Sequence, residues 1–142
     1  MKVYLDANVF IYAATDTGRS GICAVQILEA VQAGKVHALT SVLTLDEITF
    51  VVKKLRDLPT AITLGKSFLQ LNNLEIAPAT IETAAVALEA MEQYSFLPRD
   101  ALHYATARMH TASVIVTEDQ DFNKIQGLKR FSIKEFASHI SE

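Results

Sequence analysis

The apolar residues of this chain follow two different spacings. Short continuous runs, often β-branched, have the length of buried strands, whereas longer segments carry apolar residues at every third or fourth position, as on one face of a helix. The short runs predict strands at residues 2–5, 37–40, 74–77 and 113–116, with a short edge strand at 129–131. The helical spacing predicts helices at 8–14, 21–33, 44–56, 60–71, 80–94, 99–110 and 133–140, and a single helical turn at 122–125.

Helices therefore separate most of the strands. That order is typical of an α/β domain with a mainly parallel sheet built from right-handed crossovers. The chain has no internal repeat, linker or low-complexity segment, so we expect residues 1–142 to form a single domain. In such folds ligands bind outside the carboxyl ends of the strands, which makes the residues that follow each strand the first candidates for chemistry.

Composition narrows the class of protein without indicating a function. The chain has 142 residues, half of them apolar, and no run approaches the roughly 20 apolar residues that span a bilayer. Its N-terminus lacks a signal-peptide pattern, so we expect a cytoplasmic protein with no membrane partner. The formal net charge of −3 gives no electrostatic indication of nucleic-acid binding. The excess carboxylates could instead be gathered at a site whose cations reverse the local sign.

Cysteine chemistry and a zinc site are not indicated. Cys23 is the single cysteine and cannot form an intramolecular disulfide, and its apolar neighbours favour a structural position. The four histidines are scattered along the chain without close pairs or cysteine partners, which argues against zinc; they are His37, His103, His110 and His139.

Asp6 follows the first predicted strand directly. An acid at the end of a central strand is poorly explained by solvation unless the strand opens into a polar cleft. Asp6 could instead cap the helix that begins near Asn8. A phosphatase of the haloacid type also has an aspartate after its first strand, but it needs a second aspartate where this chain has Asn8, so that interpretation is weaker.

Glu47 lies at the border of the apolar arc of its helix, whereas Asp46 projects from nearly the opposite side. A carboxylate beside the buried face can reach into a cleft, which makes Glu47 the better candidate ligand and Asp46 the better solvated residue. The alternative is a capping box, in which Thr44 caps the helix and Glu47 is its partner three residues later.

Two further acidic segments follow later in the chain. Asp100 falls in the first turn of its helix, where the unpaired backbone N–H groups favour negative charge, and that role alone could explain it. Glu118, Asp119 and Asp121 come immediately after the predicted strand at 113–116. Like charges this close cost free energy unless a cation is bound. A hydrophilic turn in which Asp121 caps the last short helix could explain one of the three, but not all of them.

Taken in order, these acidic segments resemble the four motifs of the PIN domain family. The matching pieces are Tyr4–Val9, Leu45–Ile48, Pro98–Ala101 and Val116–Phe122. Each piece is weak alone, but the four occur in order over essentially the whole chain. The resemblance implies a three-layer α/β/α fold with a mainly parallel sheet of four to five strands. It also implies an acidic pocket at the strand ends.

The resemblance assigns roles to particular residues. The catalytic and metal-binding positions match Asp6, Glu47, Asp100 and Asp119, with Asp121 as an additional metal-site acid. The polar positions that support the pocket match Asn8 and Thr117. The last acidic position is ambiguous, because Glu118 enlarges its cluster.

Oxygen-rich sites without histidine or cysteine favour hard cations, so the expected cofactor is Mg²⁺ or Mn²⁺. Two such ions about 4 Å apart can activate a water and stabilise both oxygens of a phosphodiester displacement. The predicted reaction is hydrolysis of RNA and, by the resemblance, leaves a 5′-phosphate. Asp6, Glu47 and Asp100 would hold the main ion, while Asp119 would orient its water or complete a second site, with Asp121 assisting.

Contacts to the RNA backbone must come from basic residues. Arg99 is the favoured substrate-binding residue because it neighbours Asp100. The lysine pair Lys53 and Lys54 at a helix end is more simply explained as a solvated face. The other candidates rank below Arg99; they are Arg19, Arg56, Lys129 and Arg130.

Small stand-alone proteins of this family resemble the toxins of type II toxin–antitoxin pairs (VapC-like). These are usually dimeric, and a small antitoxin covers the acidic pocket. Two helices here are unusually apolar, and we expect them to line a groove for an antitoxin helix while another surface forms a homodimer. Alternatively, these residues pack on each other in a small helical subdomain; they are Ile22, Val25, Ile27, Leu28, Val31, Ile62, Leu64, Phe68, Leu69 and Leu71.

Two other functions stay open at this point. A catalytically inert PIN-like binding module would be expected to have lost some acids, yet all four are present. A signalling receiver would need a phosphoacceptor after a middle strand and a lysine after a late one, and neither is evident because Val116 is followed by Thr117 and two acids within three residues.

Overall fold

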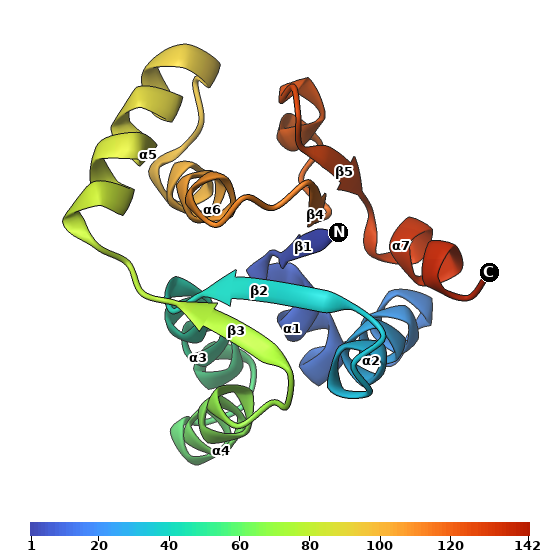
Figure 1. The fold of residues 1–142 in the computed structure, drawn as a ribbon. Coiled ribbons are helices and arrows are strands. Elements are labelled where there is room, and N and C mark those ends of the chain that lie inside the picture. The colour runs from blue at the N-terminus through green and yellow to red at the C-terminus, as the bar shows by residue number, and fades with distance from the viewer.

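Five parallel strands form one sheet in the order β3-β2-β1-β4-β5. The computed structural model describes residues 1–142 (Figure 1). The strands are β1 (Lys2–Leu5), β2 (His37–Ser41), β3 (Leu74–Ala77), β4 (Val114–Val116) and β5 (Lys129–Phe131). The helices are α1 (Ala7–Thr15), α2 (Arg19–Gln32), α3 (Leu43–Leu55), α4 (Leu58–Leu69), α5 (Ile81–Tyr94), α6 (Pro98–Met109), the 3₁₀ turn η1 (Gln120–Lys124) and α7 (Ile133–Ile140).

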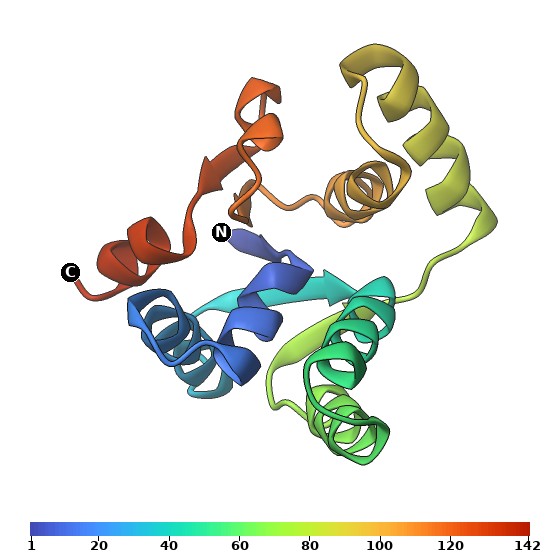
Figure 2. The same ribbon diagram turned by 180° about the vertical axis from the view of Figure 1, so that it is seen from behind.

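Helices cover both faces of this sheet, as Figures 1 and 2 show from opposite sides. Strand side chains alternate between the faces, so Val3 and Leu5 join the core under α1–α4 and α7, while Tyr4 joins the core under α5 and α6. The predicted three-layer α/β/α fold with a mainly parallel sheet is therefore confirmed, with all five strands parallel. No helix is both long and apolar enough to cross a bilayer.

The strand order reverses beside β1. The chain moves from β1 outward through β2 and β3, and then returns to the other side of β1 to form β4. Val3 consequently pairs with Ala38 of β2 on one side and with Val114 of β4 on the other. A reversal of strand order of this kind leaves a crevice at the carboxyl ends of the two strands, where ligands of open α/β sheets bind.

The ends of the helices lie within about two residues of the predicted ends, but one predicted helix cap is wrong. Thr80 caps α5, as predicted. Thr44 does not cap α3, which begins at Leu43 without a side-chain cap. Its buried hydroxyl instead bonds to that of Thr40 at 2.7 Å, and Thr40 in turn donates to the Leu5 carbonyl. The predicted capping box with Glu47 is therefore wrong, and the Glu47 carboxylate is left to other partners.

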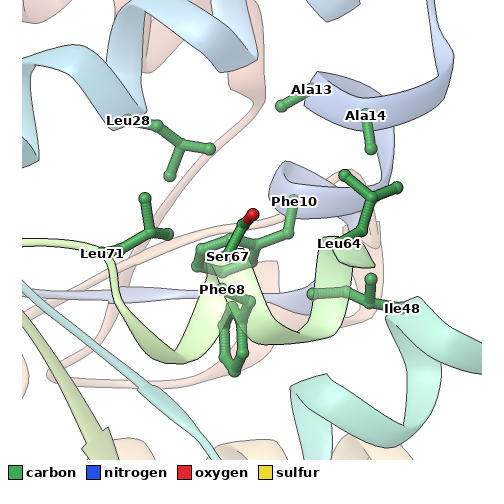
Figure 3. A pocket seen from close by; sticks show the side chains of 9 residues that line it. All are labelled: Phe10, Ala13, Ala14, Leu28, Ile48, Leu64, Ser67, Phe68 and Leu71. Carbon is green, nitrogen blue, oxygen red and sulfur yellow. The ribbon is translucent and has the colours of Figure 1, made fainter. Parts of the chain in front are cut away.

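A hydrophobic groove lies between the α1–α2 and α3–α4 helix pairs. Figure 3 shows its lining, which comes from all four helices and from Leu71 just after α4; the residues are Phe10, Ala13, Ala14, Leu28, Ile48, Leu64, Ser67, Phe68 and Leu71. Of the ten apolar residues expected to form such a groove, Ile27 and Val31 belong to the core instead. Ile22, Val25, Ile62 and Leu69 are exposed outside it.

Candidate active site

Asp6 lies at the carboxyl end of β1, where it caps α1 and also contacts polar residues of two other segments. Its Oδ1 accepts a hydrogen bond from the backbone N–H of Ala7 at 2.7 Å, so it caps α1. Its Oδ2 accepts from Thr117 Oγ1 at 2.6 Å and from Asn8 Nδ2 at 3.2 Å. The carboxylate is only 6 % exposed. Burial raises the pKa of Asp6, although the positive charge of His103 and the Thr117 hydrogen bond oppose that effect.

Thr117 joins the ends of β1 and β4. Its hydroxyl donates to Asp6 and accepts from the backbone N–H of Asp119 at 3.0 Å, and Asn8 Nδ2 lies at 3.2 Å from the same oxygen. Asn8 and Thr117, the two expected supporting residues, therefore contact each other and Asp6. Together they fix the carboxylate relative to both strands.

Glu47 reaches the same place from α3, together with a residue that the sequence did not indicate. Nε2 of His103, on α6, lies 2.5 Å from Glu47 Oε2 and 3.6 Å from Asp6 Oδ1. Burial alone would lower the pKa of His103, but its hydrogen bond to Glu47 and the charges of Asp6 and Asp100 outweigh burial and raise the pKa. The expectation of a site without histidine is thus wrong. The spacing of His103, three residues after Asp100 on one helix face, was the available indication.

A second acidic group adjoins the first. Carboxylate oxygens of Asp100, Asp119 and Asp121 lie within 4.8 Å of one another. Burial, a hydrogen bond with Asp119 and the charges of Asp119 and Asp6 raise the pKa of Asp100 to about 7. The structure therefore brings Asp100 closest to Asp119 and Asp121, rather than to the group formed by Asp6 and Glu47.

Glu118 does not belong to this group. Its Oε1 accepts a hydrogen bond from the backbone N–H of Ile133, the first residue of α7, at 2.8 Å. Its side chain therefore points to α7, and Asp119 and Asp121 are the acids of the last motif that face Asp100. Asp121 was expected to cap the 3₁₀ turn, but the capping residue is Asp119. Its carboxylate accepts a hydrogen bond from the backbone N–H of Asp121 at 2.9 Å.

Arg99 lies at the exposed edge of the first group. Its Nε is 3.8 Å from Glu47 Oε1, and its guanidinium is 3.9 Å from Asp46 Oδ2. The Glu47 side chain is 15 % exposed and that of Asp46 is 72 % exposed, which agrees with the assignment of Glu47 to the cleft. Asp46 is nevertheless close to the edge of the site, because Arg99 lies near both carboxylates.

The family is decided by a comparison with known domains: the model described as PIN domain matches residues 3–128. The chain belongs to the PIN domain family. The match contains every residue of both acidic groups. A comparison with curated proteins finds no match.

Solved structures agree with this PIN domain in fold. A VapBC2 structure from Rickettsia felis, bound to a DNA fragment from its promoter, has a TM-score of 0.70 at 22 % identity and covers 93 % of this chain and 98 % of its own. VapC20 of Mycobacterium tuberculosis, described as a Sarcin-Ricin loop cleaving toxin, has a TM-score of 0.69 at 14 % identity, covering 85 % and 92 %. FitAcB from Neisseria gonorrhoeae has a TM-score of 0.70 at 20 % identity, covering 93 % and 98 %.

The side chains of this PIN domain fit a hard divalent cation. The first group offers the two carboxylates of Asp6 and Glu47 with the imidazole of His103 beside them, and the second offers three carboxylates. In the second group, the pKa of Asp100 is raised to about 7 by burial first, and then by the hydrogen bond with Asp119 and the negative charges of Asp119 and Asp6. A cation between these oxygens would offset the part of that raised pKa which comes from the negative charges, and oxygen donors are those that Mg²⁺ and Mn²⁺ prefer.

Proposed function

We propose that this protein is a metal-dependent ribonuclease that hydrolyses phosphodiester bonds of RNA, and that it is the toxin of a type II toxin–antitoxin pair. The observation that carries the proposal is the gathering of five carboxylates, in two adjoining groups, from α3, α6 and the segments that follow β1 and β4. Such crowding of like charge costs free energy in a metal-free protein, and it is useful where cations must be held.

Mg²⁺ or Mn²⁺ would be held by Asp6, Glu47 and Asp100, with Asp119 completing the set and Asp121 assisting. When bound, the cation supplies an activated water and stabilises the charge that develops on the phosphate, so that RNA is cut with a 5′-phosphate on the product. The two groups seen in the structure suggest how the acids divide if two ions bind: Asp6 and Glu47 on one side, Asp100 with Asp119 and Asp121 on the other.

The remaining side chains would orient these acids and the substrate. Thr117 and Asn8 hold Asp6 Oδ2 in place before any cation arrives, so little reorganisation is needed on binding. Arg99 is 62 % exposed at the edge of the site, and its guanidinium can bind a phosphate oxygen of the RNA once Glu47 has a cation as partner. Such an enzyme would meet its substrate in the cytoplasm.

An antitoxin would be the protein partner. Several of the similar solved structures are toxin–antitoxin complexes by their descriptions, including one from Klebsiella pneumoniae with a TM-score of 0.64. The groove of Figure 3 provides an apolar surface with Leu28, Leu64 and Leu71 only partly buried, and an amphipathic helix of an antitoxin would bury them. A homodimer through a different surface is proposed as well, which light scattering would test.

The deciding experiment is cleavage of single-stranded RNA by the purified protein with Mg²⁺, with Mn²⁺, and with excess EDTA. We expect cleavage only with metal, because the site contains no organic nucleophile that could replace it. Cleavage that is undiminished in EDTA would refute the metal mechanism. Tight Mn²⁺ binding without cleavage of any RNA tested would favour the alternative, a catalytically inert PIN-like binding module.

A further inference from the structure

Behind the first acidic group lies a buried chain of hydrogen bonds that none of the roles above uses. The Tyr4 hydroxyl is 2.5 Å from His103 Nδ1, and His103 Nε2 is 2.5 Å from Glu47 Oε2. Tyr4 has no exposed surface and His103 is 1 % exposed. The three residues come from β1, α6 and α3, and they are joined only by the tertiary structure.

The chain is not needed to fill the core. Phe and Leu would occupy similar space at Tyr4 and His103 without the cost of burying a hydroxyl and an imidazole, which is offset only when their hydrogen bonds are made. The two polar groups are nevertheless aligned in series, and the last member of the series is a candidate metal ligand. That alignment indicates a role at the metal site.

The hydrogen bonds also determine which ring nitrogen can carry the proton toward Glu47. A carboxylate only accepts, so Nε2 carries an N–H and donates to Glu47 Oε2. Nδ1 is bonded to the Tyr4 hydroxyl, which donates to it when the ring is neutral and accepts from it when the ring is positively charged. Both ring nitrogens are occupied in this arrangement, which leaves no lone pair of His103 for a cation.

Glu47 depends on this bond more than Asp6 does on any one partner. Asp6 accepts hydrogen bonds from Ala7, Asn8 and Thr117. Glu47 has one hydrogen bond, from His103, and otherwise only the solvent-exposed Arg99 at 3.8 Å. A glutamate has three side-chain torsions, and fixing them on metal binding costs conformational entropy. A hydrogen bond that already fixes them in the metal-free protein lowers the entropy cost of binding the cation.

We propose that Tyr4 and His103 are positioning residues, which hold the Glu47 carboxylate in the orientation needed to bind a divalent cation. The proposal rests on the proposed metal-dependent function. Its ligand class is Mg²⁺ or Mn²⁺, and Glu47 is the residue through which both positioning residues act.

The test measures Mn²⁺ affinity without RNA, by calorimetry and by electron paramagnetic resonance, for four variants. His103→Leu removes the donor to Glu47 and should weaken Mn²⁺ binding by about 10- to 100-fold, the usual effect of losing a group that orients a ligand. His103→Gln can place an amide N–H near the position of Nε2 and should restore most of the affinity. Tyr4→Phe should weaken binding less, by a few-fold at most, and should have no further effect when combined with His103→Leu.

Tyr104→Phe is the matched control, because it removes a phenol hydroxyl from the same helix and the same core without touching the Tyr4–His103–Glu47 chain. It should bind Mn²⁺ as the wild type does. If His103→Leu does not fold, as judged by circular dichroism, Tyr4→Phe and His103→Gln still decide the proposal, since both keep the size of the original side chain.

Two results would overturn it. Wild-type Mn²⁺ affinity in all the folded variants would mean that the chain is structural only. Equal loss in His103→Leu and His103→Gln, together with ¹⁴N coupling to Mn²⁺ in the wild-type spectrum, would make His103 a direct ligand. Failure of the proposed function is a different observation, namely a wild-type protein that binds no Mn²⁺ or cuts no RNA.

Discussion

Replacing Asp119 with asparagine tests whether the second acidic group is crowded in the absence of metal. The change removes one negative charge beside Asp100, and asparagine caps a helical turn as well as aspartate does, so the cap of η1 is kept. We expect the metal-free variant to be more stable than the wild type at pH 8, because Asp100 can then ionise at lower cost. The same variant should bind Mg²⁺ or Mn²⁺ more weakly.

The magnitude follows from the pKa of Asp100, which lies at about 7 instead of 3.8. At about 1.4 kcal/mol per unit, the full shift would correspond to about 4 kcal/mol. Asp100 is only half-buried, so solvent screening reduces this figure to roughly 1–2 kcal/mol. Burial is the largest cause of the raised pKa and remains in the variant, which leaves about 1 kcal/mol for Asp119, or about 2–4 °C in Tm for a domain of this size.

The pH dependence gives the prediction its sign. The folded protein keeps the Asp100 proton up to a pKa of about 7, whereas the unfolded chain releases it near 3.8. The wild type therefore loses stability as the pH rises through that window, and the loss is complete above about pH 7. The advantage of Asp119→Asn should be absent at pH 4 and full at pH 8.

Thermal unfolding in EDTA at both pH values, followed by titration with Mg²⁺, is the assay. Asp46→Asn, with the same change of charge on an exposed side chain, is the control and should shift the Tm by little. A metal-free Asp119→Asn protein that melts below the wild type at pH 8 would refute the reasoning, and would mean that Asp119 mainly makes structural hydrogen bonds.

Three further predictions follow from the site and the groove. Asp6→Asn should lower kcat for RNA cleavage by orders of magnitude with the fold intact, while Asp46→Asn should be nearly silent; a larger effect of Asp46→Asn would contradict the division between the cleft and the exposed side of α3. Glu118→Gln should leave the cleavage rate unchanged but lower the Tm, since it weakens the bond to the Ile133 N–H, so an inactive variant would put Glu118 back in the site. Leu64→Glu should abolish antitoxin binding measured by calorimetry, whereas Ile62→Glu, on the exposed side of the same helix, should not; Phe68→Glu is unsuitable because Phe68 is 4 % exposed and would be expected to unfold the protein.

The elements of this fold could be predicted from the sequence because each carries its own local pattern. The β-branched run Val114–Val116 predicts a buried strand. The capping residue Thr80 predicts where α5 begins. Local patterns fail where a tertiary partner competes. Thr44 has the spacing of a helix cap, but the hydroxyl of Thr40 on β2 takes its hydrogen bond and the helix starts earlier. Pro59 was expected to lie between two helices, but it lies in the first turn of α4, where a proline is tolerated.

Asp6, Asp100 and Asp119 could be picked out as candidates because each follows a strand or lies in the first turn of a helix, and Glu47 because it borders the apolar face of its helix, but the grouping of the acids could not be predicted. Asp100 lies beside Asp119 and Asp121, and this grouping depends on how α6 packs against the end of β4, which no sequence spacing specifies. His103 was missed for a related reason. Its partners, Glu47 and Tyr4, are 56 and 99 residues away along the chain, so its isolation in the sequence says nothing about its surroundings in the fold.

Side chains of β1 alternate between the two faces of the sheet, and this alternation explains how one short strand contributes both Tyr4 and Asp6. Val3 and Leu5 face the core on the side of α1–α4 and α7, so Tyr4 must face α6, the helix that carries His103 and Asp100. One residue after Leu5, the strand ends at the crevice with Asp6. A shift of one residue in the pairing of β1 with β2 and β4 would turn Tyr4 toward the wrong layer and break its bond to His103. The strand register that buries the two cores is thus the same register that brings Tyr4 to His103 Nδ1 and Asp6 to the end of the strand. A change of register at β1 would therefore affect the stability of the sheet and the alignment of the acids together.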